Sequence, residues 1–310
     1  MRKIIPFLTI PAAVILGASY YTYQKAFYHP PRRREKPFVA PEKRNDGPYR
    51  EQIDGYLEAV TSLPFEEVRI RSYDGTELVG HYYHQADGAP LQIQFHGYKG
   101  TPVRDFCGGH TLARSLGHNI LLVEQRAHGS NRRRSISFGV KERRDCLAWA
   151  EYAAQRFGED QKILLVGVSM GATTVLMASE LALPRGVVGV IADCPYSTPR
   201  EIICKVAGEM GFPPRAAYPF LWTGALLYGG FRLDSDGAVG AVKRSRLPVL
   251  LIHGEADDFV PCEMSRAIKA AGGERIRLET FPGATHGMSL LADPERYRRV
   301  TEEFCESVLH

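Results

Sequence analysis

The sequence predicts an α/β fold: a mainly parallel, eight-stranded sheet with helices on both faces and a short helical cap. Two observations carry this prediction. From Leu91 onward, short apolar runs alternate with segments of helical periodicity, and this alternation gives right-handed crossovers between parallel strands. The motif G-V-S-M-G at 167–171 joins an apolar run to a helical one, the context in which a serine is presented on a sharp turn.

The N-terminal segment, 1–28, is predicted to be a membrane anchor. Arg2 and Lys3 are followed by a stretch from Ile4 to Tyr23 without a charged residue, about the length that spans a bilayer as a helix. Aromatic residues cluster at its end, as at a membrane interface. The alternative is a cleaved signal peptide, because small residues at 17–19 resemble a cleavage site. A single-pass anchor of unassigned sidedness is the first expectation, and secretion after cleavage is the second.

Residues 29–63 are expected to be a linker followed by a short amphipathic helix at 51–63, since 29–50 is rich in Pro, Arg, Lys and Glu. The globular domain is expected over 64–310. It opens with a hairpin, strands 67–72 and 77–85, around an Asp-Gly turn. The expected later strands are 91–96, 119–125, 162–166, 187–193, 248–253 and 275–280, and the expected helices are 102–116, 140–157, 172–180, 262–271 and 294–308.

An insertion at 195–246 interrupts the alternation and is predicted to form the cap. It contains five prolines and many large apolar residues. These residues either pack the cap onto the sheet or form a wall for an acyl group. The insertion is short for a full lid, which favours an open site and small or medium acyl substrates.

Ser169, in the 167–171 motif, is the candidate nucleophile. The turn holds it in a strained conformation above the strand end, and the flanking glycines let neighbouring backbone pass close. A serine hydroxyl needs a histidine base, and that histidine needs a carboxylate to orient it. His286 follows the last strand on a loop and is the candidate base.

The acid lies in the loop after the strand at 248–253, where Asp257 and Asp258 are adjacent. Spacing alone does not choose between them, and Asp193, at the end of an earlier strand, is a third candidate. The oxyanion donors are expected to be the backbone N–H groups of Met170 and Tyr98, which follow the nucleophile and an earlier strand. His96 is expected to be structural.

Five motifs resemble those of the α/β-hydrolase superfamily, and most closely those of serine-aminopeptidase-like, BAAT-like and membrane-anchored bacterial hydrolases. They are F-H-G-Y-K-G at 95–100, E-Q-R-A-H-G-S at 124–130, G-V-S-M-G at 167–171, H-G-E-A-D-D-F-V-P at 253–261 and T-H-G at 285–287. The resemblance covers about 65–310. It assigns the acid to Asp257, because the family motif H-G-x-x-D-x-x-V-P places it there.

The predicted activity is that of a serine hydrolase cleaving an ester, thioester or amide, most simply a carboxylesterase. The alternatives are an aminopeptidase or acyl-amide hydrolase, and a non-catalytic binding protein that kept the fold. The mechanism needs no metal or organic cofactor. The net charge of +4 comes without a nucleic-acid-binding motif, and the six cysteines are scattered, as in buried free thiols. The partners expected are a small or medium acyl substrate and, through 1–28, a membrane; the oligomeric state is left open.

Overall fold

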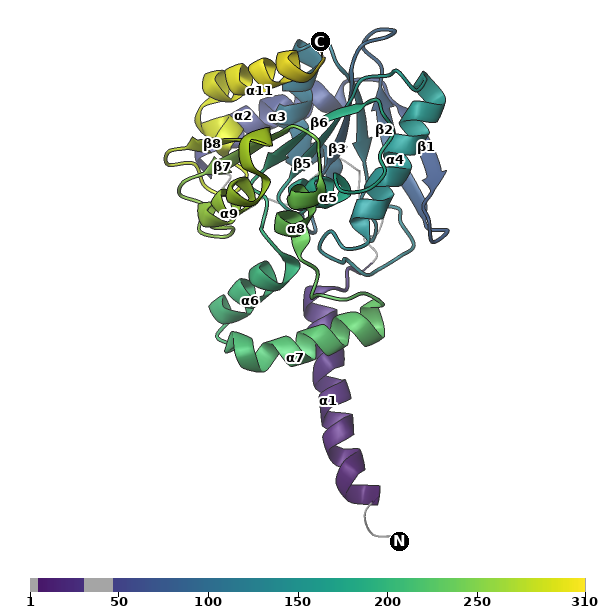
Figure 1. Ribbon diagram of the computed structural model, residues 1–310, viewed down its shortest axis with the longest axis vertical. Coiled ribbons are helices and arrows are strands. Elements are labelled where there is room, and N and C mark those ends of the chain that lie inside the picture. Colours follow the sequence, from purple (N-terminus) through teal and green to yellow (C-terminus); the bar gives the residue numbers. More distant parts are fainter. Residues whose placement is uncertain (1–4, 31–46, 310) are drawn as a thin grey trace.

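The computed structural model describes residues 5–30 and 47–309, and the side chains from residue 13 onward. Its centre is one eight-stranded sheet with the strand order β1-β2-β4-β3-β5-β6-β7-β8 (Figure 1). The first two strands pair antiparallel with each other and β2 pairs antiparallel with β4, whereas every later pair is parallel. The predicted fold class is confirmed. The strands are β1 (Glu66–Arg71), β2 (Glu77–Tyr83), β3 (Leu91–Phe95), β4 (Asn119–Val123), β5 (Ile163–Val168), β6 (Val187–Asp193), β7 (Val249–Gly254) and β8 (Ile276–Phe281).

Helices cover both faces of the sheet, so strands β3, β4 and β7 are buried along their whole length. One core cluster lies between the sheet and α4, α5, α8 and α9, with Trp149, Val175 and Ile268 among its members. The opposite cluster lies under α2, α3 and α11. These helices are α2 (Arg50–Thr61), α3 (Pro102–Ser115), α4 (Glu142–Phe157), α5 (Met170–Ala178), α8 (Gly237–Arg244), α9 (Cys262–Gly272) and α11 (Pro294–Leu309), with short turns η1 (Gly47–Tyr49), η3 (Gly273–Arg275) and α10 (Ser289–Ala292).

The insertion expected at 195–246 divides into two parts. Helices α6 (Pro199–Glu209) and α7 (Pro214–Gly224), with the π-helical turn η2 (Ala225–Gly229), form a cap below the sheet (Figure 1). Helix α8 instead packs on α5 and α9, and Ala238 and Val242 belong to the main core. The cap is therefore shorter than the insertion.

The N-terminal helix α1 (Ile5–Ala26) contacts the cap at its C-terminal end, and the rest of the helix extends away from the domain (Figure 1). Its C-terminal end crosses α7 (Figure 1). Phe27 is fully buried in a third apolar cluster, where its ring meets those of Phe138 and Phe231 at 5.8 and 5.3 Å. A hydrogen bond from Thr22 Oγ1 to the Phe220 carbonyl, at 3.1 Å, also joins the C-terminal end of α1 to α7.

Among the helices within the described residues, none is long and apolar enough to cross a membrane. The anchor expected over 1–28 stays a prediction, and its first four residues lie outside the described part of the chain. Most of the linker expected at 29–50 also lies outside it. The six cysteines are all described, and all are free thiols.

Candidate functional site

Ser169 stands at the turn between β5 and α5, with φ 54° and ψ −116°. This left-handed backbone is strained for a residue with a side chain. Two glycines make it possible. A Cβ at Gly171 would lie 1.8 Å from the Phe95 carbonyl oxygen, and one at Gly167 would lie 2.3 Å from the carbonyl carbon and oxygen of Gly171. The turn is therefore packed so tightly that neither glycine can carry a side chain, as the motif predicted.

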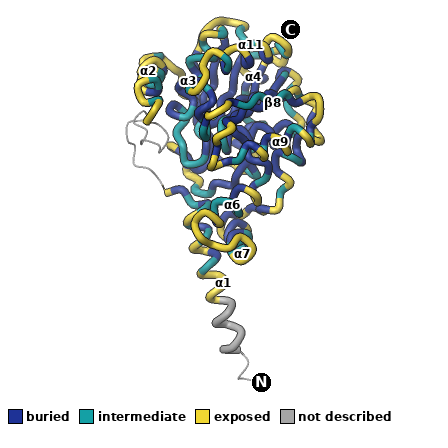
Figure 2. Tube along the Cα trace, turned by 90° about the vertical axis from the view of Figure 1, so that its left-hand side faces the viewer, coloured by how far each residue is buried: buried dark blue, intermediate teal, exposed yellow. Residues whose placement is uncertain are grey.

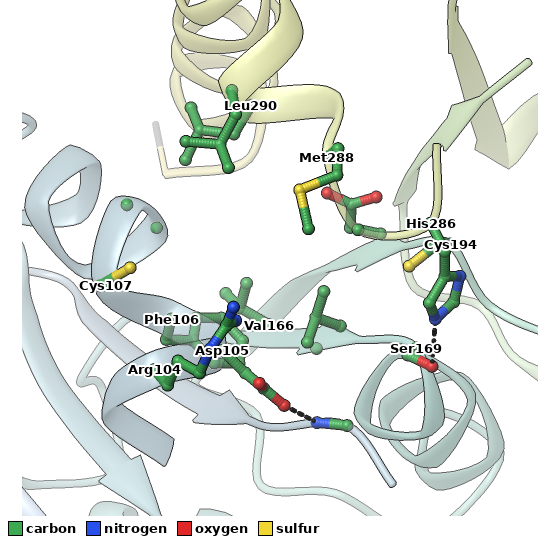
Figure 3. A pocket seen from close by; sticks show the side chains of 18 of the residues that line it. Arg104, Asp105, Phe106, Cys107, Val166, Ser169, Cys194, His286, Met288 and Leu290 are labelled. Carbon is green, nitrogen blue, oxygen red and sulfur yellow. Dashed lines mark hydrogen bonds between the residues drawn. The ribbon is translucent and has the colours of Figure 1, made fainter. Parts of the chain in front are cut away.

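The structure brings Ser169, His286 and Asp257 into one hydrogen-bonded line. Ser169 Oγ lies 2.9 Å from His286 Nε2 (Figure 3). On the other side of the ring, His286 Nδ1 lies 2.7 Å from Asp257 Oδ2. With Nδ1 donating to the carboxylate, Nε2 is free to accept the serine proton. The three residues come from loops after β5, β7 and β8, at the same edge of the sheet.

Asp257 is the carboxylate that contacts His286. Burial would raise the pKa of Asp257, but hydrogen bonds from His253 and His286, the charge on His286 and the Val260 amide outweigh it and hold that pKa well below its usual range. The amide N–H groups of Phe259 and Val260 also donate to its Oδ1, at 3.0 and 2.8 Å. Asp257 therefore stays ionised beside the imidazole.

The two other candidate acids lie elsewhere. Asp258 lines the cavity described below. Asp193 is buried, and its Oδ2 accepts from the Tyr297 hydroxyl at 3.1 Å. Burial, opposed by the charge of His253, by that hydrogen bond and by the charge of His286, raises the pKa of Asp193 to about 6.

The two predicted oxyanion donors lie close to the nucleophile. Met170 begins α5, and the first N–H groups of a helix have no acceptor within the helix. On the other side, a Cβ at Gly97 would lie 3.4 Å from Ser169 Cβ, so the loop carrying Tyr98 passes directly beside the serine. Tyr98 and Ser169 both line one cavity.

Asp105 and His128 hold the loop at 97–100, and sequence reasoning gave neither a role. Asp105 Oδ2 accepts from the Gly97 amide at 3.0 Å (Figure 3), and His128 Nε2 accepts from the Lys99 amide at 3.0 Å. Asp105 stands in the first turn of the helix after the strand, a position that could have indicated it. The Tyr98 hydroxyl donates to the Ala26 carbonyl at 2.8 Å, which ties the loop to α1.

Two further histidines make hydrogen bonds that hold the loops of the site. His96, expected to be structural, lies between the Gly97 carbonyl at 2.8 Å and the Gln125 amide at 3.1 Å. His253, for which no role was predicted, lies beside the acid loop, with Nε2 2.8 Å from the Val260 carbonyl and 3.3 Å from Asp257 Oδ2. It links the end of β7 to Asp257.

A cavity of about 710 Å³ opens beside Ser169. Figure 3 shows Ser169 and His286 at one side of it and apolar side chains from α3, β5 and the 288–291 segment along the rest. The apolar residues of 195–246, one of whose expected roles was to form a wall for an acyl group, do not line this cavity. Among the described residues of that segment, Glu209 lines it. The apolar lining includes Phe106, Val166, Ile191, Met288, Leu290 and Leu291.

Three potential metal ligands also meet here. One ligand atom each from Cys194, Asp257 and His286 lies within 4.8 Å of the others. Burial raises the pKa of the Cys194 thiol well above its usual value, so it stays neutral, whereas metals bind the thiolate. Both ring nitrogens of His286 already have hydrogen-bond partners. These contacts favour a hydrogen-bonded triad over a metal site.

Comparisons with known proteins show the family and the fold of the chain. A model of the alpha/beta hydrolase family matches residues 95–300. The uncharacterised protein YqkD of Bacillus subtilis is 24% identical over 240 residues, covering 77% of this chain and 78% of YqkD. The esterase Pf2001 of Pyrococcus furiosus has a similar structure, with a TM-score of 0.68, 18% identity and coverage of 92% of this chain and 99% of the esterase.

An acylaminoacyl peptidase of Pyrococcus horikoshii is also similar in structure. Its TM-score is 0.56 at 19% identity, over 81% of this chain and 42% of the peptidase. At such identities the structures share the fold with this chain and not necessarily the substrate. The family model alone spans most of the domain, including all the site residues described above. The chain belongs to the alpha/beta hydrolase family.

Proposed function

We propose that this chain is a serine hydrolase, a carboxylesterase in the simplest case, that cleaves an ester, thioester or amide through an acyl-enzyme. The observation that carries the proposal is the hydrogen-bonded line from Ser169 through His286 to Asp257, at the mouth of a largely apolar cavity. The esterase and the acylaminoacyl peptidase of similar fold are consistent with acyl transfer.

In the first half of the reaction, Ser169 Oγ attacks the acyl carbon while His286 Nε2 takes its proton. The negative charge that develops on the carbonyl oxygen is stabilised by the N–H groups of Met170 and Tyr98. His286 then gives its proton to the leaving group as the bond to the acyl carbon breaks. Asp257 fixes the imidazole tautomer and stabilises the imidazolium.

In the second half, water replaces the leaving group. His286 takes a proton from the water as its oxygen attacks the acyl-enzyme, and returns the proton to Ser169 Oγ when the ester bond breaks. The acid product leaves, and the free enzyme is restored. The apolar lining of the cavity favours the acyl part of the substrate.

A fluorophosphonate probe tests the proposal, because it forms a covalent bond only with an activated serine. We expect labelling of the full chain at Ser169 and none in Ser169→Ala. The same variant should lose hydrolysis of chromogenic esters by about 10⁴-fold or more. Ser130→Ala, on a nearby loop, is the control and should keep both. Absence of labelling in the wild-type protein would favour a non-catalytic binding protein.

The acyl preference is tested with chromogenic esters of graded chain length beside aminoacyl amides. We expect esters of small or medium acyl groups to be cleaved fastest, because the cavity is mostly apolar. Faster cleavage of the amides would make the chain an aminopeptidase-like enzyme with the same triad.

A further inference from the structure

Exposed apolar side chains gather at one end of the molecule, away from the sheet. They come from α1, from the turn between α6 and α7, and from η2, and we call them the apolar end. Val14, Tyr21, Met210 and Leu227 are each more than half exposed, and Figure 2 shows exposed segments along α1 and α7. The apolar end consists of Val14, Ile15, Leu16, Tyr20, Tyr21, Met210, Phe212, Leu226, Leu227 and Tyr228.

The apolar end is built from two distant segments that the fold holds together. The Tyr228 hydroxyl donates to the Leu16 carbonyl at 3.2 Å. The rings of Tyr20 and Tyr228 pack edge to face at 5.2 Å. A Cβ at Gly224 would lie 2.5 Å from the Ser19 carbonyl oxygen, so the two helices approach as closely as backbones can. The surface is therefore a fixed feature of the fold.

Charge is almost absent from these segments. Arg215 is the one charged residue from Met210 to Phe231, and there is none from Ala13 to Gln24, whereas charged residues make up 24% of the chain. Soluble monomers rarely leave a large contiguous apolar surface exposed to water. A surface of this kind is built to be covered.

We propose that the apolar end docks into the interfacial layer of a phospholipid bilayer. Helix α1, which carries half of these residues, projects outward from the molecule, a shape suited to insertion among lipids (Figure 1). That helix runs from the cap away from the sheet, and the sequence stays uncharged back to Ile4. Tyrosines form much of the surface, and aromatic rings of this kind favour the headgroup level. Exposed Lys25 and Arg215 flank it, in reach of lipid phosphates.

Docking at this end places the cavity beside the lipid. Glu209 and Phe259 line the cavity, and Glu209 directly precedes Met210 of the apolar end. Lys205 Nζ on α6 donates to the Asp258 carbonyl at 2.6 Å, which joins the cap to the acid loop. Resting on the hydrolase function proposed above, the substrate is then an acyl ester that dissolves in the membrane and reaches Ser169 from the bilayer side.

The chain contains its own reporter for this contact. It has two tryptophans. Trp222 lies on α7 of the cap, and Trp149 lies on α4, where it is buried against the sheet. We expect the full chain to float with phosphatidylcholine–phosphatidylglycerol vesicles and its emission to be quenched by brominated acyl chains. Trp222→Phe should float equally well without that quenching, because Trp149 is out of reach.

A triple variant of the apolar end and a control variant elsewhere on the surface separate docking from folding. Met210→Glu, Phe212→Glu and Leu227→Glu together should weaken vesicle binding at least tenfold and reduce cleavage of a vesicle-borne diacylglycerol ester equally, with hydrolysis of a water-soluble ester unchanged. Phe65→Glu changes an exposed aromatic residue on the sheet side and should change neither vesicle binding nor cleavage of the vesicle-borne ester.

Three outcomes would overturn the proposal. Flotation without quenching of Trp222 would place the N-terminal segment, and not the cap, in the bilayer. Failure to float would exclude the bilayer altogether. A dimer in light scattering that the triple variant turns into a monomer would assign the surface to a second copy of the chain. If instead the proposed hydrolase function is wrong, the wild-type protein will fail to cleave the water-soluble ester, whatever its binding to vesicles.

Discussion

Asp257 and Asp258 are neighbours in sequence with different tasks. Asp257 is buried and contacts His286 at 2.7 Å, whereas Asp258 is exposed. A carboxylate that orients a histidine cannot be replaced by an amide without favouring the wrong tautomer. The difference between these two residues therefore tests the proposed triad more closely than removal of the serine.

We expect Asp257→Asn to lower kcat by up to about 10⁴-fold, and Asp258→Asn to lower it less than tenfold. Steady-state kinetics on the best chromogenic ester measure both. The two substitutions make the same change in net charge and in side-chain size, so neither of these alone can produce a difference between them. The reverse ranking would mean that the acid loop presents Asp258 to His286 in solution.

Asp193 is a buried carboxyl whose ionisation opposes folding. Its pKa is raised to about 6 in the folded protein from an ordinary value of 3.8. The folded state therefore binds the proton of the Asp193 carboxyl more tightly than the unfolded state does. The stabilisation that the protonated carboxyl provides is fully present below pH 4 and is lost as the pH rises through 6. Asparagine has no proton to lose.

Asp193→Asn should therefore gain stability relative to the wild type between pH 4 and pH 7, by up to about 3 kcal/mol. Denaturant unfolding at the two pH values measures this difference. Activity should stay within tenfold, because Asp193 does not contact His286. A gain that is the same at both pH values would show that the carboxyl is not the group that titrates.

At the scale of elements, the end of α1 braces the active-site loop. Tyr98 is bound to the Ala26 carbonyl. His29 Nδ1 lies 2.8 Å from the Ala127 carbonyl, and its ring is 4.8 Å from that of His128, which in turn holds the Lys99 amide. A chain shortened to begin near Arg50 would lose all of these contacts together with Phe27, so we expect it to be less active than the full chain.

Phe27→Ala should lower the free energy of unfolding by about 3–5 kcal/mol, the usual cost of emptying a buried phenylalanine site. Tyr21→Ala, on an exposed part of α1, the helix that Phe27 directly follows, should change it by less than about 0.5 kcal/mol. Denaturant unfolding of both variants tests the packing of α1. Equal effects would show that the helix is detached from the domain in solution.

At the scale of the whole molecule, local patterns predicted more than long-range contacts did. The turn at Ser169 could be predicted because its strand, glycines and helix are adjacent in sequence. The order of nucleophile, acid and base follows from the order of the strands. The choice of Asp257 over Asp258 needed the family resemblance, because spacing alone leaves both open.

The position of α1 could not be predicted in this way. An uncharged apolar stretch looks the same whether it faces lipid or the rings of Phe138 and Phe231, which are distant in sequence. The place of α8 could not be predicted for a related reason, since this helix is joined to the cap in sequence but packs on α5 and α9. The contacts of α8, and not its composition, assign it to the main domain.

The contact between α1 and the cap also sets an order of events during synthesis. Thr22 is bound to a carbonyl 198 residues later in the chain. At about 5–20 residues per second, some 10–40 s pass between the making of the two partners. During that time α1 lacks the cap helix α7 on which it packs, and it can be bound by any factor that captures apolar nascent chains. The brace on the 97–100 loop therefore forms late, and the hydrolase matures only when its earliest and its much later segments meet.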